Sequence, residues 1–150
     1  MHRRQILPLA ILDEAGGEVD GRTRFIKLIF LAQEKAGESF PVEYDFEAYD
    51  YGPFDKNILH DLDDLEDEGI ISSQETDIGN NKKYTYRLNN QYRGNLRDEL
   101  PEDLDITDEE WDQIESQAER VARQFNSVPI SRLLEHVYNK YPGYTSESVI

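Results

Sequence analysis

Apolar residues near the start of the chain recur at helical spacing, which predicts a helix. Ile6, Leu9 and Ala10 share one face, and Pro8 fits if it lies in the first turn, where a missing N–H costs nothing. A second helix is predicted over 22–36, with Gly37 just beyond it as a C-terminal cap. Its inward residues are Phe25, Leu28, Ile29 and Ala32, and its exposed positive residues are Arg22, Arg24 and Lys27.

From residue 42 the apolar period changes from helical spacing to two, which is typical of a half-buried strand. Val42, Tyr44, Phe46 and Ala48 would face the core, alternating with Glu43, Asp45 and Glu47. Pro53 suits the first turn of a following helix. That helix repeats its apolar residues at Phe54, Ile58, Leu62 and Leu65 and closes at Gly69.

Two further runs predict a β-hairpin, which we call the wing. Ile70 and Ile71 begin its first strand, and Tyr84, Tyr86 and Leu88 alternate with polar residues in its second. The loop over 77–81 holds Asp, Gly and Asn, the residue types that tolerate positive φ.

The carboxyl-terminal third predicts two more helices. Thr107 and Glu110 have the spacing of a capping box, and the following helix carries an apolar seam of Trp111, Ile114, Ala118, Val121 and Phe125. The seam spans only about two heptads, so it could pack onto the amino-terminal helices or form a dimer interface. A last helix follows Pro129, with Ile130, Leu133, Leu134, Val137 and Tyr138 inward, and ends at Tyr141.

The order helix, strand, helix, hairpin predicts an α+β, mainly helical fold, a winged helix-turn-helix with a C-terminal helical extension. We expect the winged part over 1–95 and the extension over 96–150, in one compact domain overall.

Charge is the feature that conflicts with this plan, because the formal net charge is −16. Residues 37–69 carry −11 and 98–150 carry −9, whereas 1–36 and 70–97 carry +1 and +3. Only six of the sixteen basic residues are lysines, and acidic residues are spread over every predicted face, as in halophilic proteins. In roughly 1 M salt the Debye length is about 3 Å, so global acidity is a poor argument against DNA binding there. The absence of cysteine and of a long apolar run favours a cytoplasmic protein with no membrane contact.

Catalytic signatures are weak, and we expect no catalytic residue, metal or cofactor. His60 and Asp64 lie four apart on one predicted helix and could share a metal, but a solvated helix face explains them better. The sequence lacks phosphate-binding glycine loops and nucleophile elbows.

Three motifs carry a resemblance to a known family. Gly21-Arg22-Thr23-Arg24-Phe25-Ile26-Lys27-Leu28, the stretch 46–54 with Tyr51-Gly52-Pro53, and Gly69-Ile70-Ile71 resemble the YwgA family of prokaryotic proteins. More distantly, the chain is similar to the Panacea (SocA-like) antitoxin-associated domain, in which a Tyr-Gly-Pro element is a hallmark. The resemblance implies a winged-helix-like fold without catalytic residues, and the Panacea likeness suggests antitoxin or defence-associated roles.

Two functions follow from these patterns. The first is sequence-specific binding of double-stranded DNA by a transcriptional regulator, possible as a homodimer on a palindromic operator. The third helix would enter the major groove, and the second helix and wing would approach phosphates. The candidate residues are Arg22, Arg24, Lys27, Lys56, Asn57, His60, Lys82, Lys83 and Arg87. The second is a protein-interaction module that has lost DNA binding and whose acidic third helix binds a basic partner, such as a toxin or a regulator.

Overall fold

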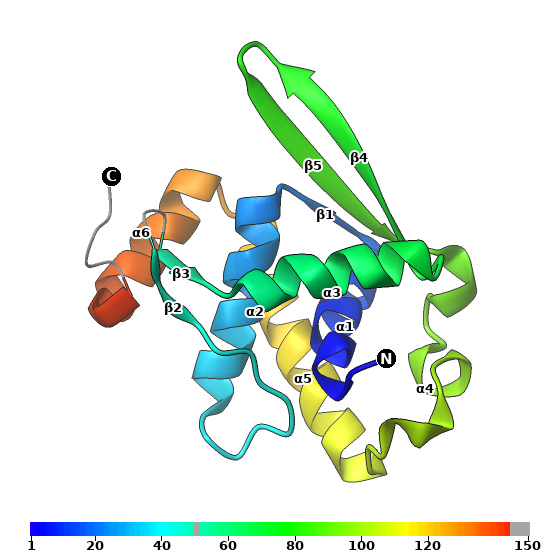
Figure 1. Ribbon diagram of the computed structural model, residues 1–150. Helices are drawn as coiled ribbons and strands as arrows, with labels where there is room; N and C mark the ends of the chain where they lie inside the picture. The colour runs from blue at the N-terminus through cyan, green and yellow to red at the C-terminus, as the bar shows by residue number, and fades with distance from the viewer. Residues whose placement is uncertain (50–51, 145–150) are drawn as a thin grey trace.

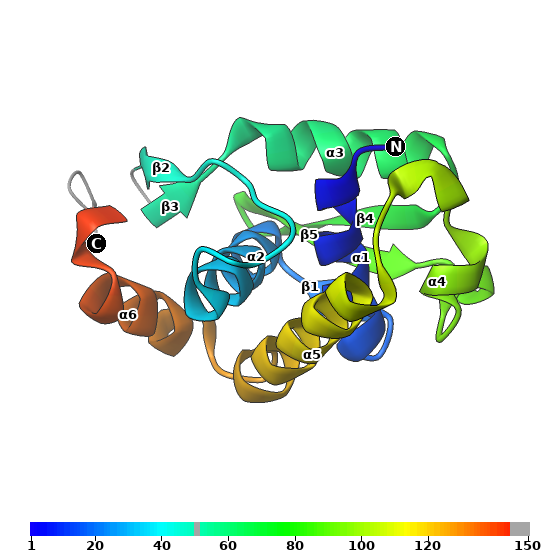
Figure 2. The ribbon, with the colours of Figure 1, turned by 90° about the horizontal axis from the view of Figure 1, so that it is seen from below.

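The computed structural model describes residues 1–49 and 52–144. Its fold is α+β and mainly helical, with two small antiparallel sheets. Figures 1 and 2 show the helices gathered around α1 and a long hairpin projecting from them. The elements are η1 (Arg3–Gln5), α1 (Ile6–Glu14), β1 (Glu18–Asp20), α2 (Arg22–Ala36), β2 (Glu47–Tyr49), β3 (Gly52–Phe54), α3 (Lys56–Asp67), β4 (Ile71–Ile78), β5 (Asn81–Leu88), η2 (Asn90–Tyr92), α4 (Leu96–Glu99), η3 (Glu102–Leu104), α5 (Asp108–Phe125), α6 (Ile130–Lys140) and η4 (Pro142–Tyr144).

Helix α1 lies at the centre of the core. Every residue from Ile6 to Leu12 is buried, and Figure 2 shows the helix between α3 and α5. Pro8 is its third residue, within the first turn as predicted, where the helix offers no hydrogen bond for it to lose. A helix buried on all sides has no polar face over this stretch.

Helix α2 has the predicted bounds and follows α1 into the core. Gly21 and Gly37 flank it with φ of 101° and 86°, a backbone conformation that only glycine adopts without strain. All residues from Phe25 to Ala32 are buried, including Lys27. The expectation that one face of α2 is exposed over this stretch is therefore wrong.

The larger sheet contains the predicted wing. Strands β4 and β5 pair antiparallel from Ile71↔Leu88 to Ile78↔Asn81, and the turn lies at Gly79 and Asn80. Strand β1, which the sequence pattern did not indicate, pairs with the inner half of β5, so the order is β1-β5-β4. The outer half of the hairpin extends beyond β1 and the helices (Figure 1). It is exposed on both faces.

The segment 42–48 has the predicted alternation but is not a strand of a sheet until its end. Val42 and Tyr44 are buried and Glu43 and Asp45 exposed, yet only β2 pairs, with β3. Instead of a neighbouring strand, the side chain of Gln33 bonds both the N–H and the C=O of Tyr44, at 2.7 and 2.8 Å. Pro53 belongs to β3 rather than to the first turn of α3, which is a second correction.

The carboxyl-terminal helices pack on the amino-terminal ones. The capping box of Thr107 and Glu110 is present, with each residue bonding the other's backbone N–H. The seam residues Trp111, Ile114, Ala118, Val121 and Phe125 are all buried within the chain, and α5 packs against α1 and α2. Of the two readings of the seam, core packing is therefore confirmed. Ile130, predicted to face inward, is 42% exposed.

Candidate nucleic-acid interface

Four of the candidate cations line one groove under the wing. Arg22 and Arg24 reach it from the start of α2, and Lys82 and Lys83 from the outer half of β5. Its volume is about 570 Å³, and Tyr84, Asn126 and Ile130 are also among its lining residues. Figure 1 shows the hairpin projecting beside the first turn of α2, which explains why residues far apart in sequence meet here. We call this feature the basic groove.

The two arginines are held in place by neighbouring groups. The Arg22 guanidinium lies 3.9 Å from the centre of the Tyr84 ring, and its Nε donates to the Tyr86 hydroxyl at 2.9 Å. Arg24 donates from Nη1 to the carbonyl oxygen of Phe125 at 3.0 Å. Partial burial lowers the pKa of Arg24, and nearby Asp20 opposes this effect. The guanidinium groups of Arg22 and Arg24 are thus held in position by these contacts.

The wing cations pair with acidic residues of the same sheet. Lys82 lies 2.9 Å from Glu75, and Lys83 lies 4.0 Å from Asp20. Arg87 bonds Glu18 at 2.6 Å and Gln74 at 3.1 Å, and it does not line the basic groove. Exposed ion pairs contribute little net stability, so a phosphate could replace Glu75 or Asp20 at small cost.

Lys27 is not available for a phosphate, which corrects the prediction. It is 3% exposed, and its Nζ donates to the carbonyl oxygen of Pro53 at 3.0 Å. Burial lowers the pKa of the Lys27 amine to about 8. The sequence held a signal for this placement, because Lys27 is the single polar residue in the run from Phe25 to Ala32.

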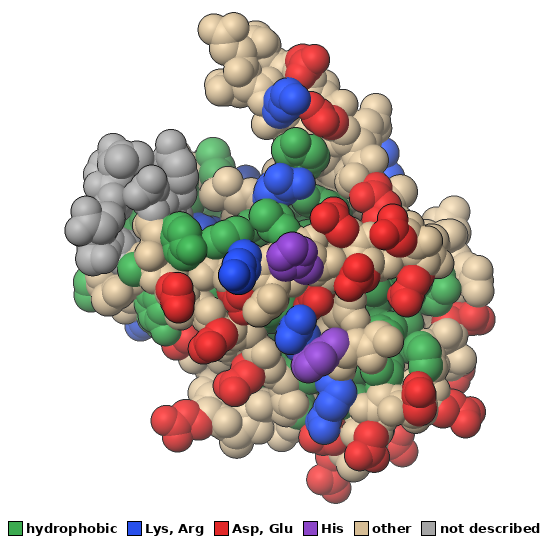
Figure 3. Space-filling view, in the orientation of Figure 1, with side chains coloured by type: hydrophobic (Ala, Val, Ile, Leu, Met, Phe, Trp, Pro, Cys, Tyr) green, Lys and Arg blue, Asp and Glu red, His purple; other side chains and the backbone are tan. Residues whose placement is uncertain are grey.

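Lys56, Asn57 and His60 lie on α3 and do not line the basic groove. Lys56 and His60 are exposed and Asn57 half-exposed, and the cavity that Lys56 and Asn57 line is shared with Asp45, Glu47 and Asp55. In Figure 3, Lys and Arg side chains run from the hairpin across α3, while Asp and Glu gather over the carboxyl-terminal half of α3. The structure therefore brings together four of the nine predicted residues, not all nine.

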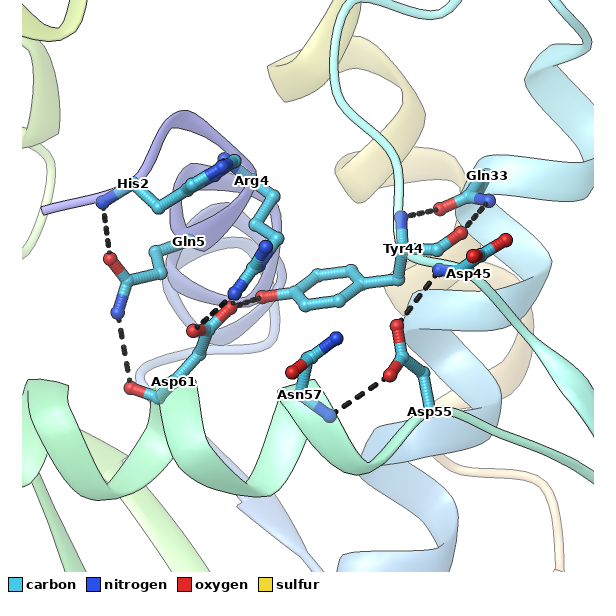
Figure 4. Close-up of polar contacts among 9 residues, drawn as sticks. All are labelled: His2, Arg4, Gln5, Gln33, Tyr44, Asp45, Asp55, Asn57 and Asp61. Carbon is cyan, nitrogen blue, oxygen red and sulfur yellow. Dashed lines mark hydrogen bonds and ion pairs between the residues drawn. The ribbon is translucent and has the colours of Figure 1, made fainter.

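Two carboxylates that sequence reasoning did not single out fix the rotation of α3 (Figure 4). Asp61 is 4% exposed, although Asp63 and Asp64 beside it in the sequence are exposed. It accepts two bonds from Arg4, at 2.7 and 3.1 Å, and one from the Tyr44 hydroxyl at 2.7 Å. Burial and the adjacent Asp61 carboxylate raise the pKa of Tyr44. The sequence does indicate that Asp61 is buried, because Asp61 falls on the same helix face as Ile58, Leu62 and Leu65.

Asp55 performs the corresponding task at the start of α3. One carboxylate oxygen accepts from the N–H of Asn57 at 2.9 Å, which caps the helix. The other accepts from the N–H of Asp45 at 2.8 Å and ties the cap to the segment before β2 (Figure 4). With Asp55 and Asp61 turned inward, Lys56 and His60 must face solvent.

Metal-ligand clusters and membrane-spanning helices are both absent from the described residues. Among residues 1–49 and 52–144, no three His, Asp or Glu side chains come together as a metal site. No helix in those same ranges is both long and apolar enough to cross a bilayer.

No family model, curated protein or solved structure matches this chain. The resemblance to the YwgA family and to the Panacea domain therefore stays a prediction that rests on the quoted motifs. Within the Tyr51-Gly52-Pro53 element, Tyr51 lies outside the described residues, whereas Gly52 and Pro53 are buried in β3.

Proposed function

We propose that the protein is a sequence-specific DNA-binding transcriptional regulator of winged-helix type. The observation that carries this proposal is the basic groove: in a chain of net charge −16, four cations from α2 and β5 line one concave surface beside a projecting hairpin. The element order α1, β1, α2, β2, β3, α3, β4, β5, with β1 pairing β5, supports a winged-helix plan.

In this proposal the basic groove contacts the phosphate backbone. Arg22 and Arg24 stand at the amino-terminal end of α2, where Gly21 supplies no side-chain cap and the first N–H groups add to the positive potential. Lys82 and Lys83 contact the same or an adjacent phosphate from the wing. Phosphate contacts fix the position of the protein on the duplex but do not read sequence.

Base recognition falls to the exposed start of α3. Lys56 donates to guanine acceptors, and Asn57 and His60 can bond base edges in the major groove. The acidic second half of the helix must then leave the groove, since Asp63, Asp64 and Asp67 are exposed and form no ion pair within the described residues. A halophilic setting would ease this placement because salt screens the repulsion.

A dimer on a palindromic site would need a surface other than the seam. Trp111, Ile114, Val121 and Phe125 are buried inside the protomer, so α5 cannot offer them to a second copy without unfolding. The proposal therefore does not depend on dimerisation through α5.

The same acidic half of α3 favours a second candidate function, a protein-interaction module of antitoxin-like or defence-associated type. Five exposed carboxylates lie within six residues at the end of α3, and such a concentration of negative charge would suit a basic protein partner: Asp63, Asp64, Glu66, Asp67 and Glu68. Glu66 accepts hydrogen bonds from the N–H and the hydroxyl of Ser73.

One selection experiment separates the two functions. The purified protein is incubated with a random-sequence duplex pool, and retained DNA is sequenced after several rounds, at low and at molar salt. The proposal expects a defined motif. A pull-down with the same purified protein serves as the comparison. Recovery of a tightly bound protein partner, together with no enriched DNA motif, would favour the protein-interaction module over the DNA-binding regulator.

A further inference from the structure

A second cavity, which we call the notch, lies between α2 and the small sheet β2–β3. Its volume is about 270 Å³. It is lined by Arg22, Thr23, Ile26, Lys27, Tyr49 and Phe54. Although the chain has 32 acidic residues, none of the described lining residues of the notch is acidic.

The polar group of the notch is the Lys27 amine. It carries three N–H donors when protonated, and the structure gives one of them a partner, the Pro53 carbonyl oxygen. Lys27 is 3% exposed, and no carboxylate among the described residues pairs with its amine. Within residues 1–49 and 52–144 the ammonium is therefore buried without a counter-charge, which is unfavourable, and an anion that entered the notch would supply that charge.

The rest of the notch is apolar and suits a small organic body. Ile26 is 4% exposed, and the Phe54 ring packs edge-on against Tyr49 with ring centres 5.1 Å apart. Tyr49 itself is 48% exposed, so it forms a rim open to solvent. A cavity of this size lies near the lower end of the range for ligand pockets, which limits the occupant to roughly one ring.

Gly52 brings the backbone close to the lysine. Its φ is +98°, and a Cβ at this position would lie 3.3 Å from Cε of Lys27 and 3.1 Å from Cε1 of Tyr138. The missing side chain lets Lys27 and Tyr138 pack closely against this backbone, and both Gly52 and Lys27 line the notch.

We propose that the notch binds a small organic carboxylate, with the carboxylate on the Lys27 ammonium and a ring or short chain against Ile26 and Phe54. Arg22, on the same helix as Lys27, also lines the notch and adds a second positive charge to it, with its Nε donating to the Tyr86 hydroxyl. Arg22 and Thr23 line both the notch and the basic groove, so a bound carboxylate also changes the charge beside the groove.

Binding is tested with benzoate and its neutral counterpart benzamide, by amide NMR titration of the full chain near pH 7. Benzoate should shift the amides of Arg22–Lys27 and Phe54 with a dissociation constant on the order of 1 mM, as expected for a ligand of this size. Benzamide should bind at least about tenfold more weakly, because it brings no charge to the ammonium. Equal binding of the two compounds, or shifts confined to another surface, would overturn the proposal.

Two variants and one control locate the site. Lys27→Met should weaken benzoate at least about tenfold, whereas Lys56→Met, which removes an exposed lysine, should leave it unchanged. If Lys27→Met does not give a folded spectrum, Tyr49→Ala at the exposed rim should weaken benzoate about threefold. If the folded variant, Lys27→Met or Tyr49→Ala, binds benzoate as tightly as the wild type, the notch is not the benzoate site. The titration contains no DNA, so it tests carboxylate binding whether or not the protein binds DNA. Only an effect of benzoate on DNA affinity rests on the proposed function, and the carboxylate proposal and the DNA proposal therefore fail separately.

Discussion

The buried lysine of α2 makes a prediction about stability that can be worked out from the structure. Burial lowers the pKa of Lys27 from 10.5 to about 8. At 1.36 kcal/mol per pKa unit, this difference means that protonated Lys27 destabilises the fold by about 3 kcal/mol relative to the neutral amine. Below about pH 8 the amine is charged in both the folded and the unfolded state, so the full penalty is present there.

The sign follows from proton binding. Between about pH 8 and pH 10.5 the unfolded chain holds a proton on Lys27 that the folded chain has released, so this group makes stability rise with pH. From pH 7 to pH 9.5 the expected gain is about 2 kcal/mol. The group contributes no further change once the pH exceeds the unfolded pKa.

Replacement of Lys27 by Met removes the charge and keeps the volume. The variant loses the bond to the Pro53 carbonyl, which costs about 1 kcal/mol, so we expect a net stabilisation of about 2 kcal/mol at pH 7. That advantage should shrink to nearly zero at pH 9.5, because the wild type gains stability over this interval.

Urea unfolding at a series of pH values measures the difference. Lys56→Met is the matched control, since it removes an exposed lysine and should change stability by less than about 0.5 kcal/mol at any of these pH values. A constant offset between wild type and Lys27→Met from pH 7 to 9.5, or a less stable variant at pH 7, would refute the reasoning.

Three further predictions concern the contacts that position α3 and the helices. Asp61→Asn should destabilise by about 2–4 kcal/mol in urea unfolding, because it leaves the Arg4 guanidinium without its carboxylate, whereas exposed Asp63→Asn should stay within about 0.5 kcal/mol; equal effects would contradict the network. Thr107→Ala should cost about 1 kcal/mol in the same assay through loss of the capping box, and no change would mean that the cap is not formed in solution. Gly52→Ala should lower the thermal midpoint through a destabilisation of about 1–3 kcal/mol, since its φ is +98°; an unchanged midpoint would count against the tight approach of β3.

Local chemistry explains which elements were predictable from the sequence. The bounds of α2 were predicted correctly because glycines with positive φ flank it at both ends. The wing was predictable because Gly79 and Asn80 follow a run that begins at Ile70 and Ile71 and precede the alternating residues Tyr84, Tyr86 and Leu88. Strand β1 was missed because three residues are too few to display a period of two.

Tertiary contacts explain the errors. The alternation at Val42–Ala48 reflects an extended segment held by the Gln33 side chain, and periodicity alone cannot distinguish this from a strand in a sheet. Lys27 was placed outside because of its charge, but α2 is enclosed on all sides at that level. Asp61 lies on the apolar stripe of α3, which indicates burial, but its partner Arg4 is distant in sequence and could not be predicted from that spacing.

The candidate site was predictable in part. Arg22, Arg24, Lys82 and Lys83 were named from the sequence, and the structure places them in one groove. That Arg87 turns toward Glu18, away from this groove, depends on the pairing of β5 with β1, which the sequence did not indicate.

The salt dependence of DNA affinity tests the central claim most directly. On a duplex recovered by selection, the logarithm of the binding constant should fall linearly with the logarithm of salt concentration, by about 0.9 per phosphate contact. The double variant Lys82→Glu and Lys83→Glu should lower that slope by about 2, whereas Arg120→Glu with Arg132→Glu, an equal change in net charge on the exposed surfaces of α5 and α6, should leave it unchanged. Equal slopes for the wing variant and the wild type, or an equal loss in both double variants, would contradict a phosphate-binding basic groove.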